Sequence, residues 1–236
     1  MSEDQFSFHQ FLEDSKNTLI NPKKYFSSMS EVHSMGNSII KALIYGLIAG
    51  IINFIWSELN LTIISFILSI IFKGSSAVGI MAGITTLITS IMLSVFILIT
   101  GSIILLLLSA VCGGISKFET IVSVTASLMV LIPLHAILNV TFWFDIFLGF
   151  VISLIIGLYG IRMLYYALVN TFKANEGIVR AITIILAIIP TLIFISYFIF
   201  VSGENFGAKY NERKFKGVDK KIHQHQRMAP RGQIGI

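Results

Sequence analysis

The segment that most constrains this chain is residues 83–111, which contain no Asp, Glu, Lys or Arg. As an α-helix with a rise of 1.5 Å per residue, this segment would extend about 43 Å, enough to cross a bilayer with tilt. After the polar break at residues 112–117, residues 120–138 form a second segment without these charged residues, about as long as one hydrocarbon core is thick. The two segments predict a transmembrane helical hairpin at the centre of an integral membrane protein.

The composition of the whole chain agrees with solvation by lipid. Of its 236 residues, 55% are hydrophobic and 12% are charged, so a soluble domain of this length could not enclose its apolar surface in one core. The formal net charge is +5, and eight of the 17 Lys and Arg residues follow Ser202. A basic tail on such a chain predicts contact with anionic lipid at the membrane surface, and no nucleic acid partner. The single cysteine, Cys112, excludes an internal disulfide and a cysteine-rich metal site, and we expect no cofactor and no metal.

Five stretches are apolar and long enough to be spans. We expect them at residues 39–56, 83–111, 120–138, 144–166 and 181–201. A further apolar stretch, residues 59–73, is short and carries polar residues three or four apart, a pattern that favours an interfacial or re-entrant helix. Residues 73–83, rich in glycine and serine, are expected to form the loop after it. The predicted fold class is all-α, a polytopic transmembrane helical bundle with five spans plus one amphipathic or re-entrant segment.

The distribution of charge leaves one question of topology open. With five spans and the amino terminus inside, the basic residues of the loops, Lys117 and Lys173 among them, lie on the cytoplasmic side, as the positive-inside rule requires. The basic tail then lies on the opposite side, against the rule. If residues 59–72 crossed as a sixth span, the tail would lie inside and Lys117, Lys173 and Arg180 outside. Because that stretch is short and amphipathic, we expect five spans.

Three regions follow from these segments. Residues 1–34 are polar, and the helical spacing of Phe8, Phe11, Leu12 and Leu19 predicts a short interfacial helix within them. Residues 35–202 are expected to form the transmembrane domain, and residues 203–236 a basic, flexible tail.

Residues 21–26 read Asn-Pro-Lys-Lys-Tyr-Phe and are expected to restart the chain as a helix. Proline suits the first helical turn, and Asn21 can cap it. Lysines beside aromatic residues are typical of the headgroup layer of a membrane. The residues expected to anchor the chain at this interface are Lys23, Lys24, Tyr25, Phe26, Trp56 and Arg162.

Small residues recur on one face of three predicted spans, which lets neighbouring helices approach closely. The residues expected to pack in this way are Ala42, Gly46, Gly50, Gly83, Ser90, Ser94, Gly149, Ser153, Gly157 and Gly160. Between the arms of the central hairpin, Gly113 and Gly114 are expected to form the turn, because a glycine pair favours a left-handed helix cap.

Few polar groups fall inside the predicted spans. Asn53 continues the small-residue face of the first span, and Pro133, His135 and Asn139 fall late in the third. Such polar groups are either hydrogen-bonded between helices or functional, as ligand-binding or proton-relaying groups. The proline is expected to bend its span and to free a carbonyl that needs another partner. These four residues are a candidate intramembrane polar site.

The order of these features resembles the Yip domain family of five-span membrane proteins, whose eukaryotic members interact with Rab-type GTPases. The likeness rests on residues 21–26, on the hairpin with its Gly113-Gly114 turn, on Pro133, and on residues 157–167 (GLYGIRMLYYA) leading through residues 173–177 (KANEG) into the fifth span. The long cytosolic region with an Asp-Leu-Tyr-Gly-Pro signature and the Gly-Tyr before the proline are absent, so the chain is closer to prokaryotic members. The resemblance implies the five-span fold and a bacterial inner (cytoplasmic) membrane.

For function, we expect a non-catalytic scaffold or adaptor in membrane organisation or trafficking, with lipid, other membrane proteins or a second copy as partners. The absence of charge deep in the spans favours this hypothesis. The alternative is a small-solute or ion transporter or channel with its site near His135 and Asn139, which would require polar groups that converge at mid-depth. An intramembrane enzyme is the weakest hypothesis, because no Ser/His, paired-Asp or His-Glu-x-x-His constellation falls within one span.

Overall fold

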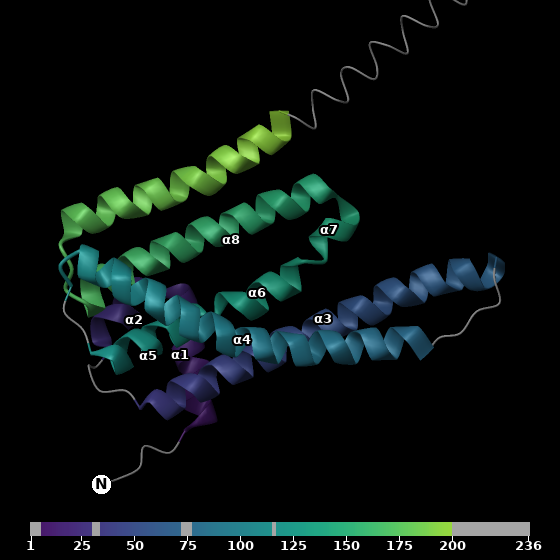
Figure 1. The fold of residues 1–236 in the computed structure, drawn as a ribbon, viewed down its shortest axis with the longest axis horizontal. Coiled ribbons are helices and arrows are strands. Elements are labelled where there is room, and N and C mark those ends of the chain that lie inside the picture. The colour runs from purple at the N-terminus through teal and green to yellow at the C-terminus, as the bar shows by residue number, and fades with distance from the viewer. Residues whose placement is uncertain (1–5, 30–33, 72–76, 115–116, 200–236) are drawn as a thin grey trace, which may run out of the picture. The chain divides into compact units, whose positions relative to one another are not determined.

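The computed structural model describes residues 6–29, 34–71, 77–114 and 117–199, and these residues form helices and their connections without a β-strand. The helices are α1 (Phe8–Ile20), α2 (Pro22–Ser28), α3 (Met35–Ile71), α4 (Ala77–Val111), α5 (Phe118–Leu128), α6 (Leu131–Leu138), α7 (Thr141–Phe144), α8 (Ile146–Tyr166), the π-helical turn η1 (Ala167–Thr171), and a final helix Glu176–Ile199 (Figure 1). The prediction of an all-α bundle is confirmed.

Five segments of the described chain are long and apolar enough to cross a membrane. They are Met35–Trp56, Gly83–Val111, Phe118–Phe144, Ile146–Thr171 and Glu176–Ile199. The prediction of five spans is therefore confirmed for the described residues, and the protein is a multi-pass integral membrane protein.

The chain divides into two compact units, Met1–Ile188 and Ile189–Ile236. The first unit holds α1 to α8 and the beginning of the final helix. In the second unit, the described residues 189–199 continue that helix. The predicted tail, residues 203–236, lies outside the described residues.

The first span does not end where the sequence suggested. α3 runs without interruption from Met35 to Ile71, so the prediction of a separate helix at residues 59–73 is wrong. Residues 57–71 contain neither glycine nor proline, and a stripe of polar residues does not by itself end a helix. α4 likewise begins at Ala77, so the predicted loop at residues 73–83 is at least partly helical. At about 55 Å, α3 is longer than the hydrocarbon core of a bilayer, which is about 30 Å.

α4 ends at the Gly113-Gly114 pair in a Schellman motif. Gly113 has φ of +71°, its N–H donates to the carbonyl of Ala110 at 3.1 Å, and the N–H of Gly114 donates to the carbonyl of Ser109 at 2.8 Å. Both hydrogen bonds satisfy carbonyl groups that the end of the helix would otherwise leave unpaired.

Replacing Gly113 with alanine is expected to lower the free energy of unfolding by about 1 kcal/mol, because an L-residue in the left-handed region brings its Cβ too close to the next carbonyl oxygen. No atom lies within 4 Å of the position of an added Cβ, so the effect comes from the backbone alone. Gly113→Asn should lower the free energy of unfolding by less than Gly113→Ala does, since asparagine tolerates this left-handed conformation. Unfolding in detergent micelles measures the difference, and equal losses for the two variants would contradict the explanation.

The third span is divided rather than bent. α5 ends at Leu128, Met129 and Val130 form a turn, and α6 then begins, which places Pro133 in the first turn of α6 where no helical N–H is needed. The carbonyl of Met129 lies four residues before the proline and accepts a hydrogen bond from the N–H of Ile132 at 2.9 Å. The freed carbonyl therefore has the alternative partner that a proline in a span requires.

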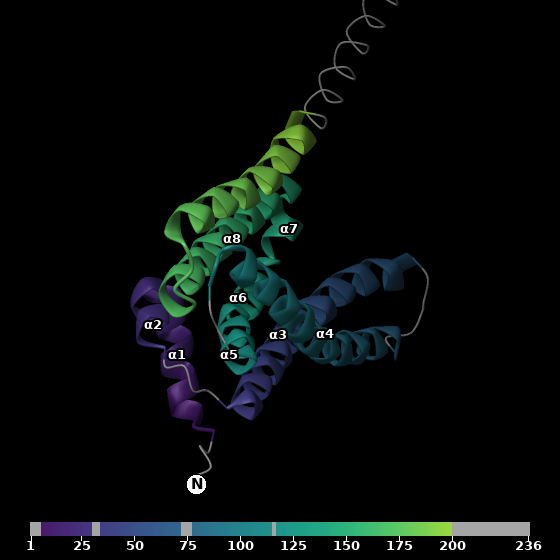
Figure 2. The ribbon, with the colours of Figure 1, turned by 60° about the vertical axis from the view of Figure 1, so that its left-hand side comes forward.

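α1 and α2 pack against the membrane-spanning helices of the first unit (Figure 2). Phe11 of α1 is buried with its ring 5.0 Å from that of Tyr45 in α3, and the hydroxyl of Ser15 lies 2.8 Å from the Tyr45 hydroxyl. Beside them, Lys41 Nζ and Asp14 Oδ2 form an ion pair at 2.6 Å. These contacts attach the amphipathic helix to the first span.

Asn21 precedes α2 but its side chain makes no capping hydrogen bond, so the prediction that it caps this helix is wrong. The residue ends α1 instead, because its backbone N–H donates to the carbonyl of Asn17 at 2.9 Å. Its ψ of 62° also departs from the extended backbone that an N-cap residue adopts.

Candidate functional site

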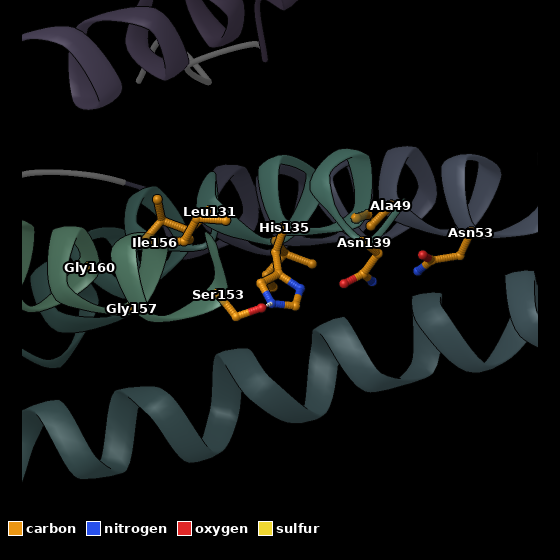
Figure 3. Close-up of a pocket in the computed structure, with 11 residues that line it drawn as sticks. Ala49, Asn53, Leu131, His135, Asn139, Ser153, Ile156, Gly157 and Gly160 are labelled. Atoms are coloured by element: carbon orange, nitrogen blue, oxygen red, sulfur yellow. Dashed lines mark hydrogen bonds between the residues drawn. The ribbon is translucent and has the colours of Figure 1, made fainter. Parts of the chain in front are cut away.

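A cleft of about 440 Å³ lies between α3, α6 and α8 and gathers most of the polar groups predicted for the intramembrane site. Figure 3 shows the side chains of Asn53, His135, Asn139 and Ser153 in this polar cleft. Pro133 is buried and does not line it. The residues that line the polar cleft are Ala49, Asn53, Leu131, Ile132, His135, Ala136, Asn139, Ser153, Ile156, Gly157 and Gly160.

Helical spacing places these groups along the polar cleft. His135 lies one turn before Asn139 on α6, and Ala49 lies one turn before Asn53 on α3, so each pair occupies one helix face. On α8, Ser153 and Gly157 are related in the same way. An added Cβ on Gly157 would have no atom within 4 Å, so this glycine leaves open space beside the polar groups.

One hydrogen bond connects two of the elements. His135 Nε2 lies 3.2 Å from the Ser153 hydroxyl, and the tautomer of the imidazole decides which atom donates. Within the described part of the chain, the side-chain amides of Asn53 and Asn139 have no hydrogen-bond partner, although both residues are half-buried. The two amides are therefore available to donate and accept hydrogen bonds to an occupant of the cleft.

The end of α6 at the polar cleft is held by side chains from two other segments. The indole Nε1 of Trp56 donates to the carbonyl of Ala136 at 3.1 Å, and the hydroxyl of Thr141 donates to the carbonyl of Leu138 at 2.7 Å. The ring of Trp56 also packs edge-on against that of Trp143, with centroids 5.8 Å apart. Trp56 therefore positions a wall of the cleft, a contact that its predicted role as an interface anchor did not include.

The predicted small-residue face of α3 contacts α4. A Cβ on Gly46 would lie 2.6 Å from Ser94 Cβ and 3.2 Å from the carbonyl oxygen of Ser90, and one on Gly50 would lie 3.2 Å from Ser90 Cβ. Ala42, Gly83 and Ser94 are buried. The two backbones thus approach each other where their side chains are smallest.

On α8 the predicted small residues have different surroundings. Gly149 is buried against the ring of Phe142, and a Cβ on Gly160 would lie 3.0 Å from Leu131 Cδ1. Gly157 has no such neighbour and Ser153 hydrogen-bonds to His135, so these two residues line the polar cleft rather than a close helix contact.

The predicted interface anchors divide into exposed and buried groups. Lys23, Lys24 and Arg162 are exposed, whereas Tyr25 is half-buried with its hydroxyl 3.0 Å from that of Ser127. Phe26 is fully buried, so the prediction that its ring lies at the lipid boundary is wrong. The reason is that α2 packs against η1, where the hydroxyl of Thr171 donates to the carbonyl of Phe26 at 2.8 Å.

The sequence did not identify Ser153 as a polar partner of His135. Ser153 is four residues from Gly149 and from Gly157, as residues of one packing face are. It lies 18 residues after His135 in the sequence and on a different helix. The only available signal was that a serine, unlike glycine, carries a hydroxyl that needs a partner.

The chemistry of the polar cleft is that of neutral hydrogen bonding. Its lining contains no Asp, Glu, Lys or Arg, and no group of three or more His, Cys, Asp or Glu that could hold a metal occurs among the described residues. The 3.2 Å contact between His135 Nε2 and the Ser153 hydroxyl is within the range for a base and a nucleophile. This pair was not predicted from the sequence, because only residues within one span were considered. No third residue among those described orients the imidazole through its other nitrogen, as a catalytic triad would.

Comparison of the chain with protein-family models, with curated proteins and with solved structures gives no match in any of the three. The resemblance to the Yip domain family therefore rests on its sequence motifs alone.

Proposed function

We propose that this integral membrane protein is a non-catalytic carrier or channel that binds a small, neutral, hydrogen-bonding solute in the polar cleft. The observation that carries the proposal is the convergence of Asn53, His135, Asn139 and Ser153 from three helices, with neither amide hydrogen-bonded to another described residue. Two amides, an imidazole and a hydroxyl offer both donors and acceptors and no fixed charge, which suits an amide or a polyol better than an ion.

The position and size of the polar cleft support this proposal. A volume of about 440 Å³ lies within the range of small-molecule sites. Ser153 lies about 10 Å along the helix axis from Ile146 at the start of α8, and Gly157, at about 16 Å, lies near the middle of a hydrocarbon core of about 30 Å. The break between α5 and α6 makes the third span discontinuous next to Leu131, a residue of the cleft wall. Discontinuous spans form the substrate site in many transporters.

The scaffold role was expected because the spans carry no charge at depth and have small-residue faces that pack closely. On α3 and α4 these faces contact each other within the chain, through Gly46 and Gly50 on one side and Ser90 and Ser94 on the other. This close packing agrees with the expectation but identifies no partner, so the scaffold role stays a prediction.

A second candidate function is hydrolysis by the pair Ser153 and His135, which is favoured by their 3.2 Å contact. Incubation with a fluorophosphonate probe distinguishes it from solute binding. The carrier proposal expects no covalent labelling of Ser153, and labelling that disappears in Ser153→Ala would favour the hydrolase.

Proteoliposomes are expected to admit glycerol, urea or acetamide faster than protein-free vesicles, and His135→Ala and Asn139→Ala should each reduce this rate to near the protein-free value. The physical reason is that each substitution removes a hydrogen-bonding group that replaces the hydration of the solute. Stopped-flow light scattering after osmotic challenge measures the rate. His9→Ala is the matched control, since His9 is exposed on α1 away from the polar cleft, and it should leave the rate unchanged. Wild-type vesicles no faster than protein-free vesicles for all three solutes would refute the proposal.

A further inference from the structure

A second cleft, of about 550 Å³, lies between the start of α2 and the end of α8, and its lining is basic. Lys23 and Lys24 from α2 and Arg162 from α8 contribute three cationic side chains to this basic cleft, together with the hydroxyl of Ser27 and the ring of Tyr166. The guanidinium carbon of Arg162 lies 5.7 Å from the centre of the Tyr166 ring, a cation–π contact within the basic cleft.

No carboxylate of the described residues forms an ion pair with any of these three cations. Among the described residues the ion pairs are Lys41 with Asp14 and Arg180 with Glu176, and neither includes Lys23, Lys24 or Arg162. Glu176 interacts electrostatically with Lys23, but its carboxylate accepts hydrogen bonds from Arg180 at 2.8 Å and from the Tyr165 hydroxyl at 3.0 Å. Three like charges around one cavity repel one another, so an anion in it would lower their electrostatic energy.

The walls of the basic cleft are held in place by contacts that do not use the cations. The hydroxyl of Tyr159 donates to the carbonyl of Leu19, and that of Thr171 donates to the carbonyl of Phe26 at 2.8 Å. The first of these hydrogen bonds joins α8 to α1, and the second, together with the buried Phe26 ring, joins η1 to α2. Lys23, Lys24 and Arg162 can therefore contact a ligand without giving up a structural role.

The depth of the basic cleft matches the headgroup layer. Asp145 caps the first turn of α8, and Arg162 lies about 24 Å along the helix axis from Ile146, close to the far boundary of a hydrocarbon core of about 30 Å. Arginine and tyrosine are typical of this boundary. Ile20 also lines the basic cleft and is 63% exposed, so an exposed apolar side chain adjoins the three cations.

We propose that the basic cleft binds the phosphate group of an anionic membrane lipid. Lys23, Lys24 and Arg162 pair with the phosphate oxygens, and an acyl chain packs against the exposed side chain of Ile20. Arginine at such a site provides a planar pair of donors that matches phosphate geometry. The lipid is chosen over free phosphate because the basic cleft combines charge with an exposed apolar side chain at headgroup depth.

The test is native mass spectrometry of the full chain in detergent after addition of phosphatidylglycerol, of phosphatidylcholine with the same acyl chains, or of potassium phosphate. Phosphatidylglycerol is expected to be retained as one molecule per chain. Each basic residue near a membrane surface contributes about fivefold to binding, so the triple variant K23Q/K24Q/R162Q should weaken retention about a hundredfold. The matched control K16Q/K117Q/K173Q removes the same charge from exposed lysines outside the basic cleft and should retain the lipid as the wild type does.

Three results would overturn the proposal. They are equal retention of phosphatidylcholine, unchanged retention of phosphatidylglycerol by K23Q/K24Q/R162Q, and binding of potassium phosphate in preference to the lipid. If the triple variant fails to fold, the single variant Arg162→Gln gives the same test at an exposed position, with retention about fivefold weaker. Arg162→Lys keeps the charge but loses the planar pair of donors, so it should restore retention in part. Equal retention by these two single variants would also overturn it.

Discussion

Replacing Gly46 or Gly50 with leucine is expected to destabilise the protein strongly, with the larger loss at Gly46. A Cβ at Gly46 would lie 2.6 Å from Ser94 Cβ, and one at Gly50 would lie 3.3 Å from the carbonyl oxygen of Leu87. Overpacking of a close contact costs about 1–3 kcal/mol, and at Gly46 the helices must separate, which raises the cost further. Unfolding of the purified protein in mixed detergent micelles measures the change.

The matched control is Gly157→Leu, which makes the same substitution in a membrane-spanning helix where no atom lies within 4 Å of the added Cβ. Leucine favours helix more than glycine does by up to about 1 kcal/mol, and this gain applies to all three variants. Gly157→Leu should therefore be as stable as the wild type or slightly more so. Equal stabilities of Gly46→Leu and Gly157→Leu would show that the α3–α4 contact is not as close as described.

Phe26→Ala is expected to lower the free energy of unfolding by about 3–5 kcal/mol. The Phe26 ring is fully buried, and its loss leaves a cavity between α2 and η1. For a chain of this size the midpoint of thermal unfolding should fall by about 6 °C or more. Phe26→Leu, which fills most of the space, should recover a large part of the loss.

Phe8→Ala is the matched control for this variant, because the same residue type in the same amino-terminal region is 58% exposed. Its effect should stay within about 0.5 kcal/mol, as for most surface substitutions. If Phe26→Ala were as stable as Phe8→Ala, the aromatic ring would belong to the lipid boundary, as the lysines beside it suggested.

The positions of the spans could be predicted because a long segment without charged residues is stable in this chain only as a membrane-spanning helix. The end of the second span at Val111 was identified, although its helix begins at Ala77, and the hairpin turn followed from two adjacent glycines. The end of α3 could not be predicted, since residues 57–71 contain polar side chains at helical spacing, which fit a continuing helix and a separate interfacial one equally well.

The candidate site was predicted in part. Asn53, His135 and Asn139 stood out because polar groups are rare in the spans, and the structure brings all three to one cleft. Ser153 did not stand out, because the crossing of α6 and α8 decides which residue His135 meets, and that crossing has no local signal. The environment of Phe26 was unpredictable for a related reason: aromatic residues beside lysines occur both at the headgroup layer and over a buried contact.

The contacts of the amino-terminal helices bear on the order in which this protein is assembled during synthesis. Tyr25 reaches Ser127, 102 residues away, and Phe26 accepts a hydrogen bond from Thr171, 145 residues away. α1 and α2 are synthesised before the spans, yet they can complete these bonds only after the fourth span has been made. The two helices must therefore wait for segments that follow them by more than 100 residues, and their docking comes after insertion of the fourth span.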